Sequence, residues 1–135
     1  QLLVYPMLDD RTCARSDLAE LPPLAWSQES NRFAWQSYLG AAFGSPGVPR
    51  YAAPCRQDDL CGLPPAWIGV GTLDLFHDEC VAYAQRLSAA GVACQAIVVP
   101  GAFHGFDLAG QKLRIVEDFR RSQVAALKKY LVARH

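Results

Sequence analysis

Two residues whose side chains could share a proton stand thirty positions apart, Asp74 and His104. Asp74 follows the apolar run at 66–70, and His104 lies in the glycine-rich string GAFHGFD after a second apolar run. A carboxylate that accepts the Nδ1–H of an imidazole fixes its tautomer and stabilises the imidazolium formed in acid–base catalysis. The pair therefore predicts the acid and the base of a catalytic triad if the fold brings them together. Spacing alone favours the plainer alternative, a turn-forming aspartate and an ordinary loop histidine.

Other polar residues nearby compete for the same chemistry. His77, Asp78 and Glu79 follow Asp74 directly, and we expect them to be capping or surface groups at the start of a helix. The nearest approach to a G-x-S-x-G nucleophile motif surrounds Ser45, but Phe43 occupies the first glycine position. A proline after Ser45 would also remove a backbone N–H that an oxyanion hole needs. We therefore predict that Ser45 is a turn residue.

The rest of the pattern predicts the elements that must position Asp74 and His104. A strand–helix–strand unit over 66–99 is long enough for a parallel crossover, which brings the carboxyl ends of its strands to one edge. Apolar runs predict buried strands at 1–8, 66–70 and 96–99. Helical spacing predicts helices at 31–39, 77–90 and 112–133, the last with four apolar residues on one side, Val116, Phe119, Leu127 and Tyr130. The whole indicates an α/β fold, an open parallel sheet covered on both faces.

Composition excludes several classes of protein. The chain has 135 residues, 51% of them hydrophobic, and thirteen Lys and Arg balance thirteen Asp and Glu. Such a chain is neither disordered nor strongly basic, which speaks against a nucleic-acid partner. No apolar run approaches the roughly 20 residues that cross a bilayer, so we expect no membrane span. Nothing in the sequence suggests export, and we expect a cytoplasmic location.

The five cysteines are an odd number and cannot all pair within the chain. We expect Cys80 and Cys94 to be small core residues and the others to lie in loops. One disulfide among Cys13, Cys55 and Cys61 remains open. Cys55 and Cys61 are six residues apart, a spacing that does not suit metal ligands.

Two longer runs carry a resemblance to a known family. LPPAWIGVGTLDLFHDECVAYAQRLSAAGV and VVPGAFHGFD resemble the hormone-sensitive-lipase-like esterases of the α/β-hydrolase fold, where one strand leads to G-x-x-D and the next to HGF. QLLVYPMLD resembles the strand after the nucleophile-bearing helix. Residues 9–50 resemble the variable segment that contributes to the lid and the substrate entrance. The resemblance covers nearly the whole chain and is most specific at 63–107.

The resemblance implies that Asp74 is the triad acid and His104 the triad base. Phe106, in the HGF string, would either border the substrate pocket or serve packing, and Leu75 stands where many relatives have proline. The family's HGGG strip and GDSAGG-type serine motif have no counterpart here, and both normally lie upstream. We therefore expect residues 1–135 to be a partial domain, the C-terminal part of an α/β-hydrolase sheet without the N-terminal half. It would hold about three parallel strands and flanking helices, with strand–helix–strand–helix over 63–135.

The function implied is that of a serine carboxylester hydrolase for short or medium acyl esters, with no metal or organic cofactor. The isolated chain should be inactive, because nucleophile, oxyanion donors and base act as a unit. Strand 1–8 would pair with another chain or with the missing N-terminal part, since a bare apolar edge is hazardous. One alternative is a non-catalytic small-molecule-binding or receptor-like protein on the same scaffold. A weaker one is a flavodoxin-like domain, for which the acidic residues after the first strand suit phosphate poorly.

Overall fold

The protein is described by a computed structural model that covers residues 1–20, 24–49 and 51–132. Three strands form one parallel sheet in the order β1 (Leu2–Val4), β2 (Ala66–Gly71) and β3 (Cys94–Val99). Leu2 of β1 pairs with Trp67, and Ala66 and Gly71 of β2 pair with Cys94 and Val99. The predicted parallel sheet is confirmed, and all three strands end at the same edge.

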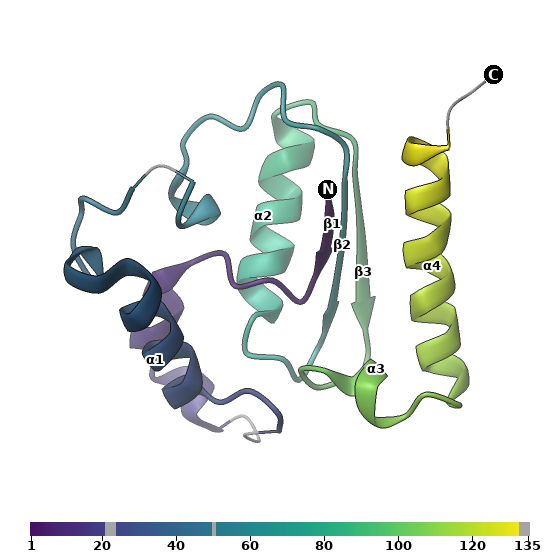
Figure 1. Ribbon diagram of the computed structural model, residues 1–135, viewed down its shortest axis with the longest axis horizontal. Coiled ribbons are helices and arrows are strands. Elements are labelled where there is room, and N and C mark those ends of the chain that lie inside the picture. Colours follow the sequence, from purple (N-terminus) through teal and green to yellow (C-terminus); the bar gives the residue numbers. More distant parts are fainter. Residues whose placement is uncertain (21–23, 50, 133–135) are drawn as a thin grey trace.

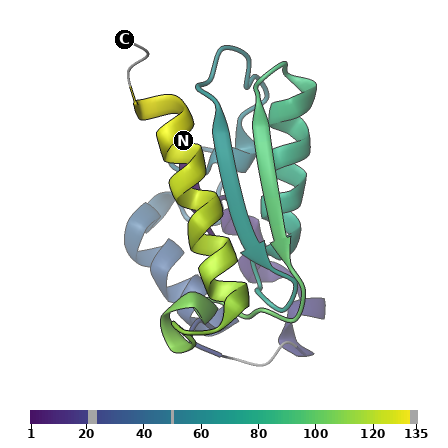
Figure 2. The same ribbon diagram turned by 90° about the vertical axis from the view of Figure 1, so that its right-hand side faces the viewer.

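Two long helices cover the two faces of this sheet. The view along the sheet in Figure 1 shows α2 (His77–Ala89) on one side and α4 (Arg114–Leu131) on the other, and Figure 2 shows the same layers turned. Successive side chains of β2 point to opposite faces. Ile68 therefore joins the core that includes Leu87 of α2, whereas Trp67 joins the core that includes Phe119 of α4.

The segment between β1 and β2 forms a separate lobe beyond α2, as Figure 1 shows. Its longest element, α1 (Gln28–Leu39), begins three residues before the predicted start, because the Ser27 side chain caps it by accepting the N–H of Ser30 at 3.1 Å. Arg56 binds both carboxylate oxygens of the buried Asp10 at 2.6 and 2.7 Å and so ties the two ends of the lobe together. The short helices of the segment are η1 (Asp10–Ala14), η2 (Asp17–Glu20), η3 (Gly40–Ala42) and η4 (Pro54–Arg56). Part of the loop predicted at 9–30 and the position 50 lie outside the described residues.

The first strand is much shorter than the predicted 1–8. It ends at Val4 because Tyr5 takes a left-handed backbone conformation, with φ of 37°, and Pro6 has no N–H for a ladder. The N–H of Leu8 then donates to the side chain of Glu79 instead of to a strand. The apolar residues after Val4 thus lie outside the sheet, and Leu8 packs in the same core as Cys80 of α2.

One further expectation about burial was wrong, and the apolar side of α4 is buried only in part. The strand predicted at 96–99 spans Cys94–Val99 and is an edge strand, so Gln95, Ala96 and Val98 are exposed. In α4, Val116 and Phe119 are buried as the predicted apolar side requires, but Leu127 and Tyr130 are 38% and 47% exposed. Ala126 takes the buried position there, one residue and thus about 100° around the helix from Leu127.

The cysteines form no disulfide, since all five are free thiols. Cys80 is buried as expected, but Cys94 is only half-buried on the edge strand, and Cys13 is a core residue of the lobe. Among the described residues, no helix is long and apolar enough to cross a membrane.

Candidate active site

Asp74 lies in the loop that joins β2 to α2, and its side chain has no exposed surface. One carboxylate oxygen, Oδ1, accepts the backbone N–H of Phe76 at 2.9 Å, and the backbone carbonyl of Asp74 accepts the N–H of His77 at 3.0 Å. The carboxylate thus sits at the N-terminal end of α2, where the helix dipole favours a negative charge. These contacts leave the second oxygen, Oδ2, directed to another partner.

That partner is His104, whose Nδ1 lies 2.9 Å from Asp74 Oδ2. His104 comes from the loop after β3, and its side chain is 17% exposed. The adjacency of β2 and β3 brings the two residues together across thirty positions of sequence. Because Asp74 carries no proton-donating group when ionised, Nδ1 holds the proton and Nε2 is the ring atom available as a base. No described residue hydrogen-bonds to Nε2.

Three hydrogen bonds join the loop that carries Asp74 to the loop that carries His104. The backbone N–H groups of Thr72 and Leu73 donate to the carbonyls of Val99 and Ala102, both at 3.0 Å. The Thr72 hydroxyl accepts the N–H of Gly101 at 2.8 Å. These bonds fix the separation of the two loops and with it the contact between the acid and the base.

Two glycines make this arrangement possible. A Cβ on Gly71, the last residue of β2, would overlap the carbonyl oxygen of Ala102, so only glycine permits the close approach of the two loops. Gly105 has φ of 73°, which turns the chain directly after His104 into α3 (Phe106–Ala109). Sequence reasoning missed the roles of Gly71 and Thr72, although a glycine at the end of a buried strand is a signal of close backbone approach.

Three aromatic rings surround the imidazole. Tyr5 and Phe76 stand edge-on to His104, with ring centroids 4.5 and 5.4 Å away, and Trp26 lies at 5.8 Å. Tyr5 follows β1 and Trp26 precedes α1, so the lobe between β1 and β2 contributes to the surroundings of His104. The sequence gives no spacing rule that could have placed either ring there.

The expectation that Glu79 is a capping or surface group was wrong. Its side chain is buried and accepts the backbone N–H groups of Leu8 and Asp9, at 2.6 and 3.3 Å, and the hydroxyl of Thr12. Burial raises the pKa of Glu79 to about 7, although the bonds from Thr12 and Leu8 act in the opposite direction. Glu79 therefore anchors the chain after β1 to α2.

His77 and Asp78 lie at the surface as predicted. His77 Nδ1 is 2.8 Å from Asp78 Oδ1, and Arg15 contacts the other oxygen of Asp78 at 2.8 Å. The hydrogen bonds from His77 and Arg15 lower the pKa of the Asp78 carboxyl. Among the interactions of the described residues, neither side chain contacts the side chain of Asp74 or of His104.

Ser45 is the turn residue that the sequence predicts. Its hydroxyl donates to the carbonyl of Ala42 at 2.9 Å and accepts the N–H of Gly47 at 3.2 Å. No serine of the described residues hydrogen-bonds to His104. The described residues also hold no group of three His, Cys, Asp or Glu side chains that could bind a metal ion.

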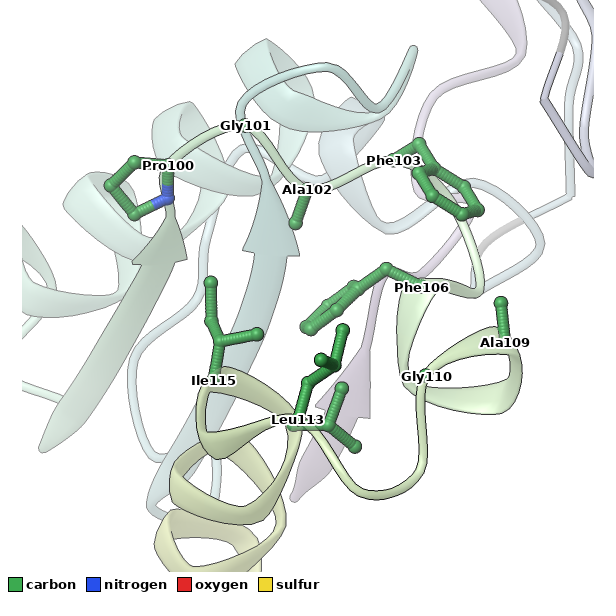
Figure 3. Close-up of a pocket in the computed structure, with 10 residues that line it drawn as sticks. Pro100, Gly101, Ala102, Phe103, Phe106, Ala109, Gly110, Leu113 and Ile115 are labelled. Atoms are coloured by element: carbon green, nitrogen blue, oxygen red, sulfur yellow. The ribbon is translucent and has the colours of Figure 1, made fainter.

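An apolar pocket of about 280 Å³ opens beside the loop of His104 (Figure 3). Phe103 and Phe106 from this loop line it, together with Leu113 and Ile115 at the start of α4. Phe106 also packs on Phe119, with ring centroids 4.9 Å apart, so it serves packing as well as lining this pocket. Asp74 and His104 do not line this pocket, and its walls alone do not tie it to their chemistry.

A buried aspartate that binds the Nδ1 of a partly exposed histidine, at the carboxyl ends of adjacent parallel strands, has the arrangement that triad hydrolases use for their acid and base. The sequence profile of a family described as having the α/β-hydrolase fold matches residues 1–108. The chain therefore belongs to this family, which confirms the resemblance to hormone-sensitive-lipase-like esterases and excludes the flavodoxin-like alternative.

Three of the relatives that the chain matches are named as ester hydrolases. An ethyl acetate hydrolase of Pseudomonas putida is 27% identical over 97% of this chain and 41% of its own length. The crystal structure of esterase LipW from Mycobacterium marinum has a TM-score of 0.82, with 37% identity over 96% of this chain and 40% of that one. The structure of a bacterial heroin esterase has a TM-score of 0.83, with 33% identity over 96% of this chain and 41% of that one. The chain thus spans about two fifths of the length of these relatives.

Proposed function

We propose that this chain supplies the acid and the base of a serine carboxylester hydrolase. The observation that carries the proposal is the 2.9 Å contact between the fully buried carboxylate of Asp74 and Nδ1 of His104. The esterase names of the relatives support the reaction class. The match to the family over residues 1–108 includes both residues.

In the proposed reaction, a serine hydroxyl attacks the ester carbonyl while Nε2 of His104 takes the hydroxyl proton. The resulting imidazolium gives this proton to the leaving alcohol as the tetrahedral intermediate collapses to an acyl-enzyme. His104 then takes a proton from the water that attacks the acyl-enzyme, and it returns this proton to the serine oxygen as the bond to the acyl group breaks and the acid leaves. Asp74 holds the imidazole in the required tautomer and stabilises its positive charge throughout.

The nucleophile and the oxyanion donors would come from a part of the protein outside residues 1–135. Three observations support this: no serine of the described residues reaches His104, β1 pairs with a strand on one side only among the described residues, and the relatives are more than twice as long. We propose that the free edge of β1 pairs with a strand of that part. The isolated chain would then hydrolyse no ester.

The substrates would be esters with short or medium acyl groups. The relative from Pseudomonas putida, an ethyl acetate hydrolase by name, supports this size range. The proposed steps require neither a metal nor an organic cofactor, because the serine supplies the nucleophile and His104 supplies the proton transfers.

The first test is an assay of the purified 135-residue chain with p-nitrophenyl acetate. We expect no saturable turnover above that of a matched His104→Ala variant. Saturable turnover that disappears in His104→Ala would contradict the proposed need for a separate serine-bearing part.

The second test restores the missing part. A chimera would carry residues 1–135 in place of the corresponding C-terminal region of LipW, whose structure matches 96% of this chain. We expect ester hydrolysis that depends on the LipW serine, on Asp74 and on His104. A folded chimera that binds a short ester without hydrolysing it would overturn the proposal and favour the non-catalytic binding protein.

A further inference from the structure

We propose that Tyr5 and Asp107 form a clamp that positions His104, so that its Nε2 stays directed toward the reacting group. Tyr5 lies at the end of β1 and Asp107 in α3, 102 residues apart, and the tyrosine hydroxyl donates to Asp107 Oδ1 at 3.1 Å. The proposal rests on the proposed function, because it assigns positioning residues to that same site. Both are positioning residues, because they act on the reaction only through His104.

The backbone of Tyr5 is strained in a way that serves this contact. Its φ of 37° is rare for a tyrosine, and the proline that follows further restricts the residue. The N–H of Tyr5 nevertheless donates to the carbonyl of Gly69 at 2.7 Å, so the residue remains attached to β2 while its side chain turns toward α3. Strained residues of this kind persist where the surrounding contacts fix them, and they cluster at functional sites.

The turned side chain places the Tyr5 ring against the imidazole. The two ring centroids are 4.5 Å apart with an interplanar angle of 61°, an edge-to-face contact. Phe76 makes a second edge-to-face contact with the imidazole, at 5.4 Å and 71°. The imidazole therefore cannot rotate away from Asp74 unless Tyr5 or Phe76 also moves.

The other half of the clamp fixes the chain that carries His104. Asp107 is buried, and its carboxylate accepts the hydroxyl of Tyr5, while its backbone carbonyl accepts Nη2 of Arg120 in α4 at 2.7 Å. The start of α3, two residues after His104, is thus held from β1 on one side and from α4 on the other. Burial and the charge of Asp107 raise the pKa of Tyr5 to about 12, so the hydroxyl keeps its proton and remains a donor.

The test follows the Nδ1–H proton of His104 by NMR in the full 135-residue chain, which requires no ester hydrolysis. Tyr5→Phe keeps the ring and removes the hydroxyl, and Asp107→Asn removes the charge of the acceptor. We expect the Nδ1–H proton to exchange with water about tenfold faster in each variant. The double variant should add little, because Tyr5→Phe removes the same hydrogen bond that Asp107→Asn weakens.

Tyr83→Phe is the matched control. Tyr83 is buried in α2, and its ring does not contact His104. In this variant the Nδ1–H proton of His104 should therefore exchange at a rate within about twofold of the parent. Amide exchange of Val70 and Ile97, in β2 and β3, reports general stability in the same samples.

Faster exchange confined to His104 and residues 105–107 would support the clamp. The proposal is overturned if both variants keep the parent rate at His104. It is also overturned if protection falls equally at Val70 and Ile97, because the contact would then stabilise the fold in general. An inactive chimera with an intact clamp would instead contradict the proposed esterase function alone.

Discussion

Two buried carboxylates, Asp74 and Glu79, lie five residues apart at the same end of α2, yet their surroundings give them different tasks. Asp74 faces a titratable partner, with Oδ2 on Nδ1 of His104. Glu79 faces groups that do not titrate near neutral pH, two backbone N–H groups and the hydroxyl of Thr12. A carboxylate paired with an imidazole can support proton transfer, whereas one bound to backbone donors can only hold the chain in place.

The comparison teaches that burial by itself does not identify a catalytic acid. Both side chains are buried, and burial raises the pKa of Glu79 to about 7. The partner of each carboxylate, rather than its burial, decides its role.

The largest expected effect is a difference in kcat between variants of the two carboxylates. In the LipW chimera, Asp74→Asn should lower kcat about 10⁴-fold, because the amide favours the wrong tautomer of His104. Glu79→Gln, of nearly identical shape, should change kcat by no more than about threefold, since Glu79 does not contact His104. Initial rates with p-nitrophenyl acetate measure both, and equal losses would remove the distinction.

Truncation of the Glu79 side chain should lower the stability of the fold. Glu79→Ala leaves two buried N–H groups and a hydroxyl without an acceptor, and we expect it to lower the free energy of unfolding by about 3 kcal/mol. Urea denaturation of the 135-residue chain at pH 5 measures this loss, with exposed Glu117→Ala as the control. A loss no larger than that of the control would show that Glu79 anchors nothing.

The pH dependence of stability should also identify Glu79. Its pKa is about 7 in the folded chain and near 4.5 when unfolded, so the folded chain binds this proton more tightly. The resulting stabilisation is complete below pH 4.5 and is lost as the pH rises through 7. Relative to Glu79→Gln, the parent should therefore lose up to about 3 kcal/mol between pH 4.5 and 8. Parallel urea curves for the two proteins at every pH would contradict this.

The smallest effect concerns the loop contact that holds Asp74 beside His104. Thr72→Val keeps the shape of the side chain and removes the acceptor of the Gly101 N–H. Because this contact is exposed, we expect a loss of only about 1 kcal/mol in the free energy of unfolding, measured by thermal denaturation. Thr72→Ser, which keeps the hydroxyl, should lose less. Identical losses in the two variants would show that the hydroxyl does not hold the loops.

The strand–helix–strand unit was predictable because its signals are local. Apolar runs, a double proline and the acidic first turn of α2 each depend on neighbouring residues, and a connection of this length is what a parallel pair of strands requires. The end of β1 at Val4 was not predictable, because an apolar run does not show where the backbone turns. The exposure of β3 depends on which strand lies at the edge of the sheet, and a short apolar run gives no information about that.

The sequence by itself determined the parallel unit and identified Asp74 and His104 as candidates, since strand ends and turn residues follow from local patterns. Only the tertiary structure decided that these two side chains meet, because that requires β2 and β3 to be neighbours and Gly71 to admit the carbonyl of Ala102. It also decided that Tyr5 and Trp26 surround the imidazole and that Glu79 is buried. Such contacts join residues far apart in the chain, and their geometry depends on the packing of the whole fold rather than on spacing.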